Sequence, residues 1–575
     1  MGRPSGRHVV PALCVAVLMA SAGCASIPTS GNVMEGSAEV ESANDLGFDV
    51  QGPAAGADPQ QVVQGFVSAA QFGPASAATF DIAREYTTSD AWSAWDEYTR
   101  VLVLSEYPEW TVQEYDDTSG STSVHGEALV VASLDEDGVY TELAEPSSVD
   151  VDFDLARGAD GQWRISGLED GLLVLANFLG NAFHRTSLYY PTSDREWWVP
   201  DVRWFPGQSW RTAATQAILA GPPDWLAQSA VSVVPEGATL AIDAVTVAED
   251  GTIDVSLTSA ITSASPEDRA LLVAQLEATL REGDGRTVVL SEGTSPLAAT
   301  TADDPSRPLT VGDAVAVLDA GSGEGQELRQ VVGRELVDLP EPLDVGGLDV
   351  TAVGVGAADG TIVVRDGRGR LVRLTDDGPV ELLVGERAVA PSIDRFGAVW
   401  TAVEGELRVV VAAGGVVPVD AEWLTDLSVR SLRVAPEGAR IALVTDGPDG
   451  PETWVAAIER DAEDTPTGLS APVRVGAPVP SVEAVGWSEE SALLLLARDA
   501  DGTRALHVTG VGGLAGSNDG RSRPLATTAV PRAVAAAVGA SPILVLDADG
   551  TVYVRQSAAL WPAISEDVVA LAYPG

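Results

Sequence analysis

The chain lacks lysine altogether, contains only two cysteines, and has no apolar run of the roughly 20 residues that a membrane-spanning helix needs. All 34 basic residues are arginine, whereas 84 residues are acidic, so the formal net charge at pH 7 is −50 over 575 residues. Nucleic-acid binding requires basic surface that neutralises phosphate, so we expect no nucleic-acid partner. Arginine in place of lysine, together with much alanine, glycine and valine, is typical of a high-GC genome.

The second cysteine, Cys24, lies where the signal of a bacterial lipoprotein would end. Before it come two basic residues, an apolar stretch and three small residues: Arg3 and Arg7, residues 9–20, and Ser21-Ala22-Gly23. This order is typical of an exported precursor and resembles a lipobox, except that Ser21 stands where leucine is usual. We therefore expect residues 1–23 to be a lipoprotein signal peptide, cleaved between Gly23 and Cys24. An ordinary secretory signal with a chance cysteine is the alternative.

Cleavage there would leave Cys24 as the first residue of the mature chain, with S-diacylglycerol on its thiol and an acylated amino group. Two acyl chains anchor a protein stably, because each buried methylene contributes about 0.8 kcal/mol. Cys14 would leave with the signal, so no intrachain disulfide could form and the fold would depend on its hydrophobic cores. We expect the mature protein to be lipid-anchored in the cell membrane, on its extracytoplasmic face.

Composition and periodicity divide the rest of the chain into a stalk and three domains. Residues 24–57 are rich in glycine, alanine, proline, serine and acids, which predicts a flexible stalk. Residues 58–185 predict an α+β domain, with helices packed on one face of an antiparallel sheet. Its first helix begins at Asp58-Pro59, a capping residue followed by a first-turn proline. Its other predicted elements are a helical stretch at residues 79–95 and strands at 101–104, 124–134, 149–155 and 163–166.

Residues 186–300 predict a second α+β domain. The pattern indicates strands at 186–191 and 197–205, helices at 212–219 and from Ser265, and a hairpin at 245–257. Three blocks in this region resemble a GerMN domain: Ala220-Gly221-Pro222-Pro223-Asp224-Trp225-Leu226, Val233-Val234-Pro235-Glu236-Gly237 and Ala274-Gln275-Leu276-Glu277-Ala278-Thr279-Leu280. The resemblance implies a binding or scaffolding module and transfers no catalytic residue.

From residue 340 to 575 short β-rich runs alternate with glycine and aspartate turns. Similar phrases recur, such as Pro391-Ser392-Ile393-Asp394-Arg395-Phe396-Gly397 and Val434-Ala435-Pro436-Glu437-Gly438. Their interval of about 45–55 residues matches a blade of four strands, which predicts an all-β propeller. We expect about five blades, or six if earlier residues close the ring, with residues 301–339 as a linker or the first propeller strands. A β-sandwich is the alternative.

The order of signal, stalk, α+β domain, GerMN domain and propeller resembles that of the actinobacterial LpqB lipoprotein family over nearly the whole chain. The start of the predicted mature protein, Cys24-Ala25-Ser26-Ile27-Pro28-Thr29-Ser30-Gly31, is similar to that family as well. The resemblance implies modulation of the MtrAB two-component system through the extracellular part of its sensor kinase, MtrB. It thereby implies an influence on envelope homeostasis and cell division.

Side chains that could catalyse a reaction or bind a metal are scattered. The mature chain would keep three isolated histidines, His125, His184 and His507, and no Gly-x-Ser-x-Gly or P-loop motif occurs. Two acidic phrases, Asp499-Ala500-Asp501-Gly502 and Asp547-Ala548-Asp549-Gly550, start like calcium loops but lack glutamate at the twelfth position, which favours hairpin turns. We therefore expect a non-enzymatic accessory protein with no catalytic residue, cofactor or metal site.

Other interpretations remain open at this stage. The 84 acidic residues guarantee accidental pairs that could serve glycoside hydrolysis, so an envelope glycan hydrolase or glycan-binding protein is the rival. A structural chaperone for envelope assembly is a third. Four tryptophans, Trp197, Trp198, Trp204 and Trp210, form either an aromatic surface for a glycan or protein partner, or packing within a strand core and a domain interface.

Overall fold

The computed structural model describes residues 50–575, with the exception of 116–117, 119, 282–286, 298–304, 306–311, 320, 322–324, 385–387 and 540–541. The predicted signal peptide, the cleavage site at Gly23 and Cys24, and residues 24–49 of the predicted stalk lie outside the described residues. In the part of the chain that is described, no helix has the length and apolar character needed to cross a membrane.

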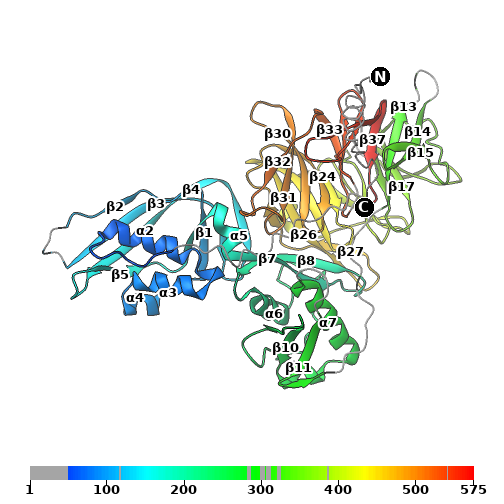
Figure 1. The fold of residues 1–575 in the computed structure, drawn as a ribbon. Helices are drawn as coiled ribbons and strands as arrows, with labels where there is room; N and C mark the ends of the chain where they lie inside the picture. Colours follow the sequence, from blue (N-terminus) through cyan, green and yellow to red (C-terminus); the bar gives the residue numbers. More distant parts are fainter. Residues whose placement is uncertain are drawn as a thin grey trace, which may run out of the picture. The chain divides into compact units, whose positions relative to one another are not determined.

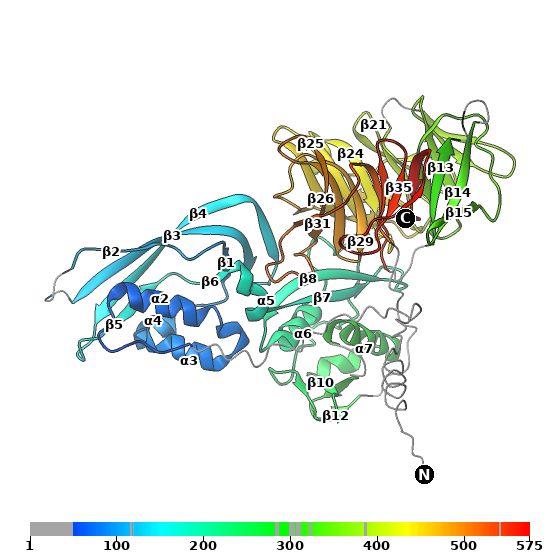
Figure 2. The ribbon, with the colours of Figure 1, turned by 45° about the horizontal axis from the view of Figure 1, so that its top comes forward.

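The first domain packs three helices on one face of a six-stranded sheet (Figure 1, Figure 2). Its elements are α2 (Pro59–Ala70), α3 (Ala77–Glu85), α4 (Ser89–Ala94), β1 (Arg100–Leu104), β2 (Trp110–Val112), β3 (Ser121–Asp135), β4 (Tyr140–Arg157), β5 (Trp163–Leu168) and β6 (Leu172–Leu175). The α2 helix begins where the sequence predicts, because Asp58 and Gln61 form a capping box. Its apolar face, with Val62, Val63 and Phe66, is buried in the core.

Two details of this domain differ from the sequence prediction. The single helical stretch at residues 79–95 is wrong, because Tyr86 and Thr88 leave the helical path to exchange backbone hydrogen bonds with Ile165 of β5. The sheet is not wholly antiparallel, because β6 pairs with β1 in parallel. Ahead of α2 the chain already contacts this domain, since the Tyr86 hydroxyl donates to the carbonyl oxygen of Gln51 at 2.7 Å.

The second domain consists of a β-hairpin, two helices and a four-stranded sheet. After a short α5 (Leu179–Ala182) come β7 (Phe183–Pro191), β8 (Trp198–Pro206), α6 (Trp210–Ala220), β9 (Thr246–Val247), β10 (Ile253–Leu257), α7 (Pro266–Leu280), β11 (Val288–Glu292) and β12 (Ser295–Pro296). The predicted caps are confirmed: Gly221, at a φ of 95°, ends α6, and the Ser265 hydroxyl caps α7. The α7 helix crosses between the parallel strands β10 and β11 and buries Leu272, Leu276 and Leu280 in the core.

The C-terminal part of the described chain is a propeller of six blades. Four strands form each blade, and one extra strand, β28, pairs with β26. The strands are β13 (Ala314–Asp319), β14 (Gln326–Val332), β15 (Glu335–Asp338), β16 (Val350–Val355), β17 (Ile362–Asp366), β18 (Arg370–Leu374), β19 (Val380–Val384), β20 (Ser392–Ile393), β21 (Val399–Val403), β22 (Glu406–Val410), β23 (Val416–Val417), β24 (Ser428–Val434), β25 (Arg440–Gly447), β26 (Gly450–Arg460), β27 (Pro466–Leu469), β28 (Val473–Val475), β29 (Val482–Glu489), β30 (Ala492–Arg498), β31 (Arg504–Gly510), β32 (Arg523–Leu525), β33 (Pro531–Ala535), β34 (Leu544–Asp547), β35 (Val552–Val554), β36 (Ala563–Ser565) and β37 (Val568–Ala572). The innermost strands β16, β20, β24, β29, β33 and β37 pack against one another around the axis.

Strands from both ends of the propeller sequence close the ring. The last blade takes its innermost strand, β37, from the C-terminal end and its other three strands, β13–β15, from residues 314–338. Val317 of β13 pairs with Leu328 on one side and with Ala570 on the other, and Figure 1 shows red β37 beside green β13. Six blades therefore surround the axis instead of about five, because residues ahead of 340 supply three of the strands.

This closure makes a prediction about β13. Val317→Ala should lower the free energy of unfolding by about 2 kcal/mol, because the substitution removes two methyl groups from a side chain that is fully buried between two strands. The matched control is Val332→Ala in β14. Val332 is 43% exposed, so this substitution should lower the free energy of unfolding by no more than about 0.5 kcal/mol. Urea denaturation measures both, and equal losses would contradict the closing role of β13.

Candidate functional site

The junction between the second domain and the propeller brings together the largest set of charged side chains that the described chain buries. On the propeller side it consists of loops that follow the innermost strands of three adjacent blades, at residues 394–398, 435–439 and 490–491. The first two loops contain the phrases that recur in the sequence. The repeats of the propeller therefore also make its contact with the second domain, and residues 50–575 form one compact unit.

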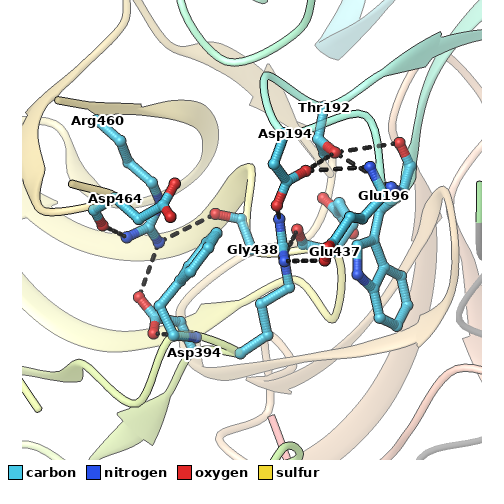
Figure 3. A network of polar contacts seen from close by, with 11 residues as sticks. Thr192, Asp194, Glu196, Asp394, Glu437, Gly438, Arg460 and Asp464 are labelled. Carbon is cyan, nitrogen blue, oxygen red and sulfur yellow. Dashed lines mark hydrogen bonds and ion pairs between the residues drawn. The ribbon is translucent and has the colours of Figure 1, made fainter. Parts of the chain in front are cut away.

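Arg395 links the propeller to the loop between β7 and β8, where Figure 3 shows Thr192, Asp194 and Glu196. Its guanidinium pairs with Asp194 and, at 3.5 Å, with Glu196, and its Nε donates to the carbonyl oxygen of Glu437 at 2.8 Å. Burial alone would raise the pKa of Asp194, but hydrogen bonds from Thr192 and Arg395 outweigh burial and hold this pKa below its ordinary value. The contact is therefore a charge-assisted one between ionised groups.

A second pair, Arg440 with Glu437, is sealed inside the same junction. Arg440 Nε lies 2.7 Å from Glu437 Oε1, and each side chain is only 1% exposed. Arg440 also donates to the carbonyl oxygen of Glu490 at 2.8 Å, and its guanidinium lies 4.8 Å from the ring centre of Trp487. From the second domain, the Tyr189 hydroxyl donates to Glu490 Oε2 at 2.8 Å. Removing one partner of such a pair leaves a buried, uncompensated charge, so the pair fixes the local arrangement.

Asp394 holds the loop that presents Arg395 (Figure 3). One of its oxygens accepts the backbone N–H of Ala398 at 2.9 Å. The other accepts the indole N–H of Trp400 at 2.8 Å and pairs with Arg460 at 2.7 Å. The Asp394 side chain has no exposed surface, and with the backbone N–H of Phe396, which donates at 3.0 Å, its four partners leave the carboxylate fully satisfied. The loop is consequently fixed before the second domain contacts it.

A longer loop between β31 and β32, residues 511–522, contacts the second domain and the first. The indole N–H of Trp204, on β8, donates to the carbonyl oxygen of Gly512 at 3.0 Å. The hydroxyl of Tyr140, on β4, donates to the carbonyl oxygen of Asp519 at 2.9 Å. One propeller loop thus joins all three domains.

Glu142 is the buried acid of this second contact. Its carboxylate accepts the backbone N–H of Ser522 at 3.0 Å and the Ser522 hydroxyl at 2.5 Å, and it lies 3.7 Å from Arg521. Only 8% of the Glu142 side chain is exposed. Burial raises the pKa of Glu142, with the hydrogen bonds from Ser522 and the charge of Arg521 opposing that rise.

The four tryptophans near residue 200 are packed, which confirms the interpretation as core and interface residues. Trp198, Trp204 and Trp210 are 1%, 2% and 5% exposed, and Trp197 is partly buried. The Trp210 ring stacks on His184, with ring centres 4.0 Å apart. These side chains therefore offer no continuous aromatic surface to a glycan or a partner.

The histidines and the two aspartate-rich turns lie apart from one another in the fold. His125 lies 2.9 Å from Asp152 between β3 and β4, and His507 lies 3.2 Å from Asp499 on the β30–β31 hairpin. The phrases that begin at Asp499 and Asp547 are hairpin turns, as predicted. Among the described residues no group of three or more His, Cys, Asp or Glu side chains is placed to hold a metal.

Sequence reasoning did not identify Arg395, Glu437, Arg440 or Glu142 as contact residues. The partners of Arg395 and Glu142 lie far away in the chain, so spacing gives no indication of those pairings, and the short spacing of Glu437 and Arg440 does not reveal that the pair is buried. The available signal was that the recurring propeller phrases contain charged residues, which a turn exposed to solvent does not require.

The Arg395 contact predicts a measurable coupling. Arg395→Gln should lower the free energy of unfolding by about 2 kcal/mol, because Asp194 would remain partly buried without its cation. A double-mutant cycle with Asp194→Asn should recover a coupling of about 1–2 kcal/mol. The control is the exposed pair Arg408 and Glu406, whose coupling should stay below about 0.5 kcal/mol. The same coupling in both cycles would contradict the special role of Arg395.

The raised pKa of Glu142 predicts pH dependence at the second contact. A carboxyl group with a higher pKa in the folded state is favoured there in its protonated form, so its contribution to stability falls as pH rises above 4.5. Glu142→Gln should remove this loss, so the stability of the variant relative to the wild type should increase between pH 5 and pH 8. Thermal unfolding at both pH values measures the gain, with the exposed Glu145→Gln as control. A pH-independent difference would contradict the burial effect.

Comparison with known protein families agrees with this architecture. Residues 52–179 match the family model of the lipoprotein LpqB N-terminal domain, and residues 326–574 match that of the lipoprotein LpqB beta-propeller domain. Residues 187–296 match the Germane model, described as sporulation and spore germination, which confirms the GerMN prediction.

Whole-chain relatives and a solved structure complete the comparison. The chain is 28% identical to lipoprotein LpqB of Bifidobacterium longum over 480 residues, covering 80% of this chain and 79% of the relative. It is 26% identical to lipoprotein LpqB of Thermobifida fusca, covering 98% of each. A chain of a nidogen/laminin complex aligns with 46% of this chain and 98% of its own, at 11% identity and a TM-score of 0.33, too low to support an argument. The three matched domains and the relatives that span the chain show that it belongs to the LpqB lipoprotein family.

Proposed function

We propose that this chain is a lipid-anchored, extracytoplasmic accessory protein without catalytic activity that binds the extracellular part of a sensor kinase. By family resemblance the kinase is MtrB of the MtrAB system, so the protein would modulate envelope homeostasis and cell division. The observation that carries the proposal is the junction itself. The Arg395–Asp194 ion pair joins the GerMN domain to the propeller next to the buried Arg440–Glu437 pair of the propeller, and one loop joins both domains to the first domain, which suits a binding platform.

The state of the buried acids also supports binding over hydrolysis. A glycosidase needs one carboxylic acid with a raised pKa and a second carboxylate near it in an open cleft. The described acids with raised pKa, Glu142 and Asp201, are both inside contacts, since Glu142 binds Ser522 and Asp201 pairs with Arg203 at 2.7 Å. Both carboxylates are occupied by these contacts instead of facing a substrate.

Anchoring would make a weak interface effective. A lipid on Cys24 would keep the protein in the same membrane as the kinase, which raises their effective concentration to the order of mM. Binding would change kinase signalling only through a difference in affinity between the signalling states of the kinase. Selectivity of the interface for one signalling state of the kinase therefore matters more than high affinity.

The test is direct association in solution. The full mature chain with Cys24→Ser should bind the MtrB extracellular domain saturably, with a dissociation constant of about 10–100 µM, since tethering would supply the rest. The Arg395→Gln variant distinguishes binding across the junction from binding by one domain alone. A loosened junction should weaken binding only if the partner contacts both the GerMN domain and the propeller. No binding by correctly folded protein at high micromolar concentration would contradict the proposal, and turnover or capture of envelope glycan would favour the rival.

A further inference from the structure

The end of the propeller channel holds a cavity that none of the contacts described so far uses. It lies where the innermost strands β24, β29, β33 and β37 end, and it contains about 450 Å³ of space, part of its open mouth included. Its lining comes from four blades and exposes polar and apolar surface in similar amounts, although most of its side chains are apolar: Arg433, Val434 and Pro436, Gly486 and Trp487, residues 534–538, and residues 572–575. Arg433 is the only side chain with a formal charge in this lining.

Arg433 has no anionic partner among the described residues. Its Nη1 donates to the carbonyl oxygen of Leu432 at 2.9 Å, whereas its Nε and Nη2 have no protein acceptor. These two atoms are not sealed from solvent, so one edge of the guanidinium faces the cavity. Three residues earlier on the same strand, Arg430 is paired with Asp446 at 2.7 Å.

The surroundings of Arg433 disfavour its bare charge. Burial lowers the pKa of Arg433 to about 10, and no nearby carboxylate opposes that effect. The group is still cationic at neutral pH, and it forms no ion pair with any carboxylate of the described residues. A bound anion would compensate the charge, which is a source of binding free energy that an exposed arginine lacks.

We propose that this cavity binds the carboxylate of a small, mostly apolar ligand, with Arg433 as the anion receptor. The free Nε–Nη2 edge matches the two oxygens of a carboxylate in a bidentate contact. A single arginine neutralises a monoanion, whereas a phosphate dianion would keep a net negative charge in the cavity. Trp487, Val534 and Pro436 supply apolar surface for the rest of the ligand. This site is independent of the proposed kinase contact.

The experiment uses the full mature chain with Cys24→Ser and saturation-transfer NMR with butyrate and benzoate. Both acids should bind, and their amides, butyramide and benzamide, should bind at least tenfold more weakly because they lack the charge. Arg433→Gln should weaken acid binding at least tenfold. Arg430→Gln, on the same strand but outside the cavity, should leave acid binding unchanged.

A second variant guards against misfolding of Arg433→Gln. Gly486→Ala adds a methyl group whose nearest neighbour is Ala536 at 3.9 Å, so it fits without strain and takes up cavity space. It should weaken benzoate more than butyrate. Equal binding of acids and amides, acid binding that Arg433→Gln and Gly486→Ala both leave intact, or preferential binding of inorganic phosphate would each overturn the proposal.

Discussion

Scarcity of positive charge is the constraint on which the rest of this structure depends. With 34 arginines against 84 acids, most carboxylates face water, and the arginines decide which acids enter the interior. Arg395, Arg440 and Arg460 bring acids into the junction with the propeller, and Arg203 does the same for Asp201 on β8. Such pairs add little net stability compared with apolar packing, but each one strongly disfavours any arrangement that separates its partners. Among these pairs Arg395 with Asp194 joins two domains, whereas the other three fix loops or a strand within one domain, and the apolar cores supply the stability.

The propeller uses one set of loops for two purposes. The turn after each innermost strand must close a tight connection, which Gly397 and Gly438 allow at φ values of 80° and 73°. In two adjacent blades the same turns carry Arg395, which pairs with Asp194 of the second domain, and Glu437, whose carbonyl oxygen accepts the Nε–H of Arg395. Asp394 links the two purposes, because it accepts the backbone N–H groups of its own turn and also fixes Arg460. Repetition thus provides the frame, and individual charged residues in the repeats provide the contact.

Local signals predicted most elements, and long-range contacts account for the errors. The capping box at Asp58, the cap at Ser265 and the glycine at 221 act within a few residues, so the sequence alone located those helix ends. The interruption at Thr88 depends on β5, some 75 residues later, which no local pattern contains. The sixth blade stayed an alternative for a similar reason: β13 looks as much like part of a linker as like a propeller strand until β37 pairs with it. The junction residues were hidden because an arginine in a turn looks the same whether its acid is absent or comes from another domain.

Trp487 shows how different two neighbouring arginines can be. Its ring lies under Arg440, whose charge is matched by Glu437, while its indole N–H donates to the backbone of Arg433 at 3.1 Å. Trp487 thus contacts both residues. Arg440 belongs to the buried junction, and Arg433 lines the cavity at the end of the channel. Arg440 has an acid within reach, whereas Arg433 has none, and burial lowers the pKa of Arg433. Arg433 therefore differs from the arginines of the junction, and it lines the cavity that we propose as a ligand site.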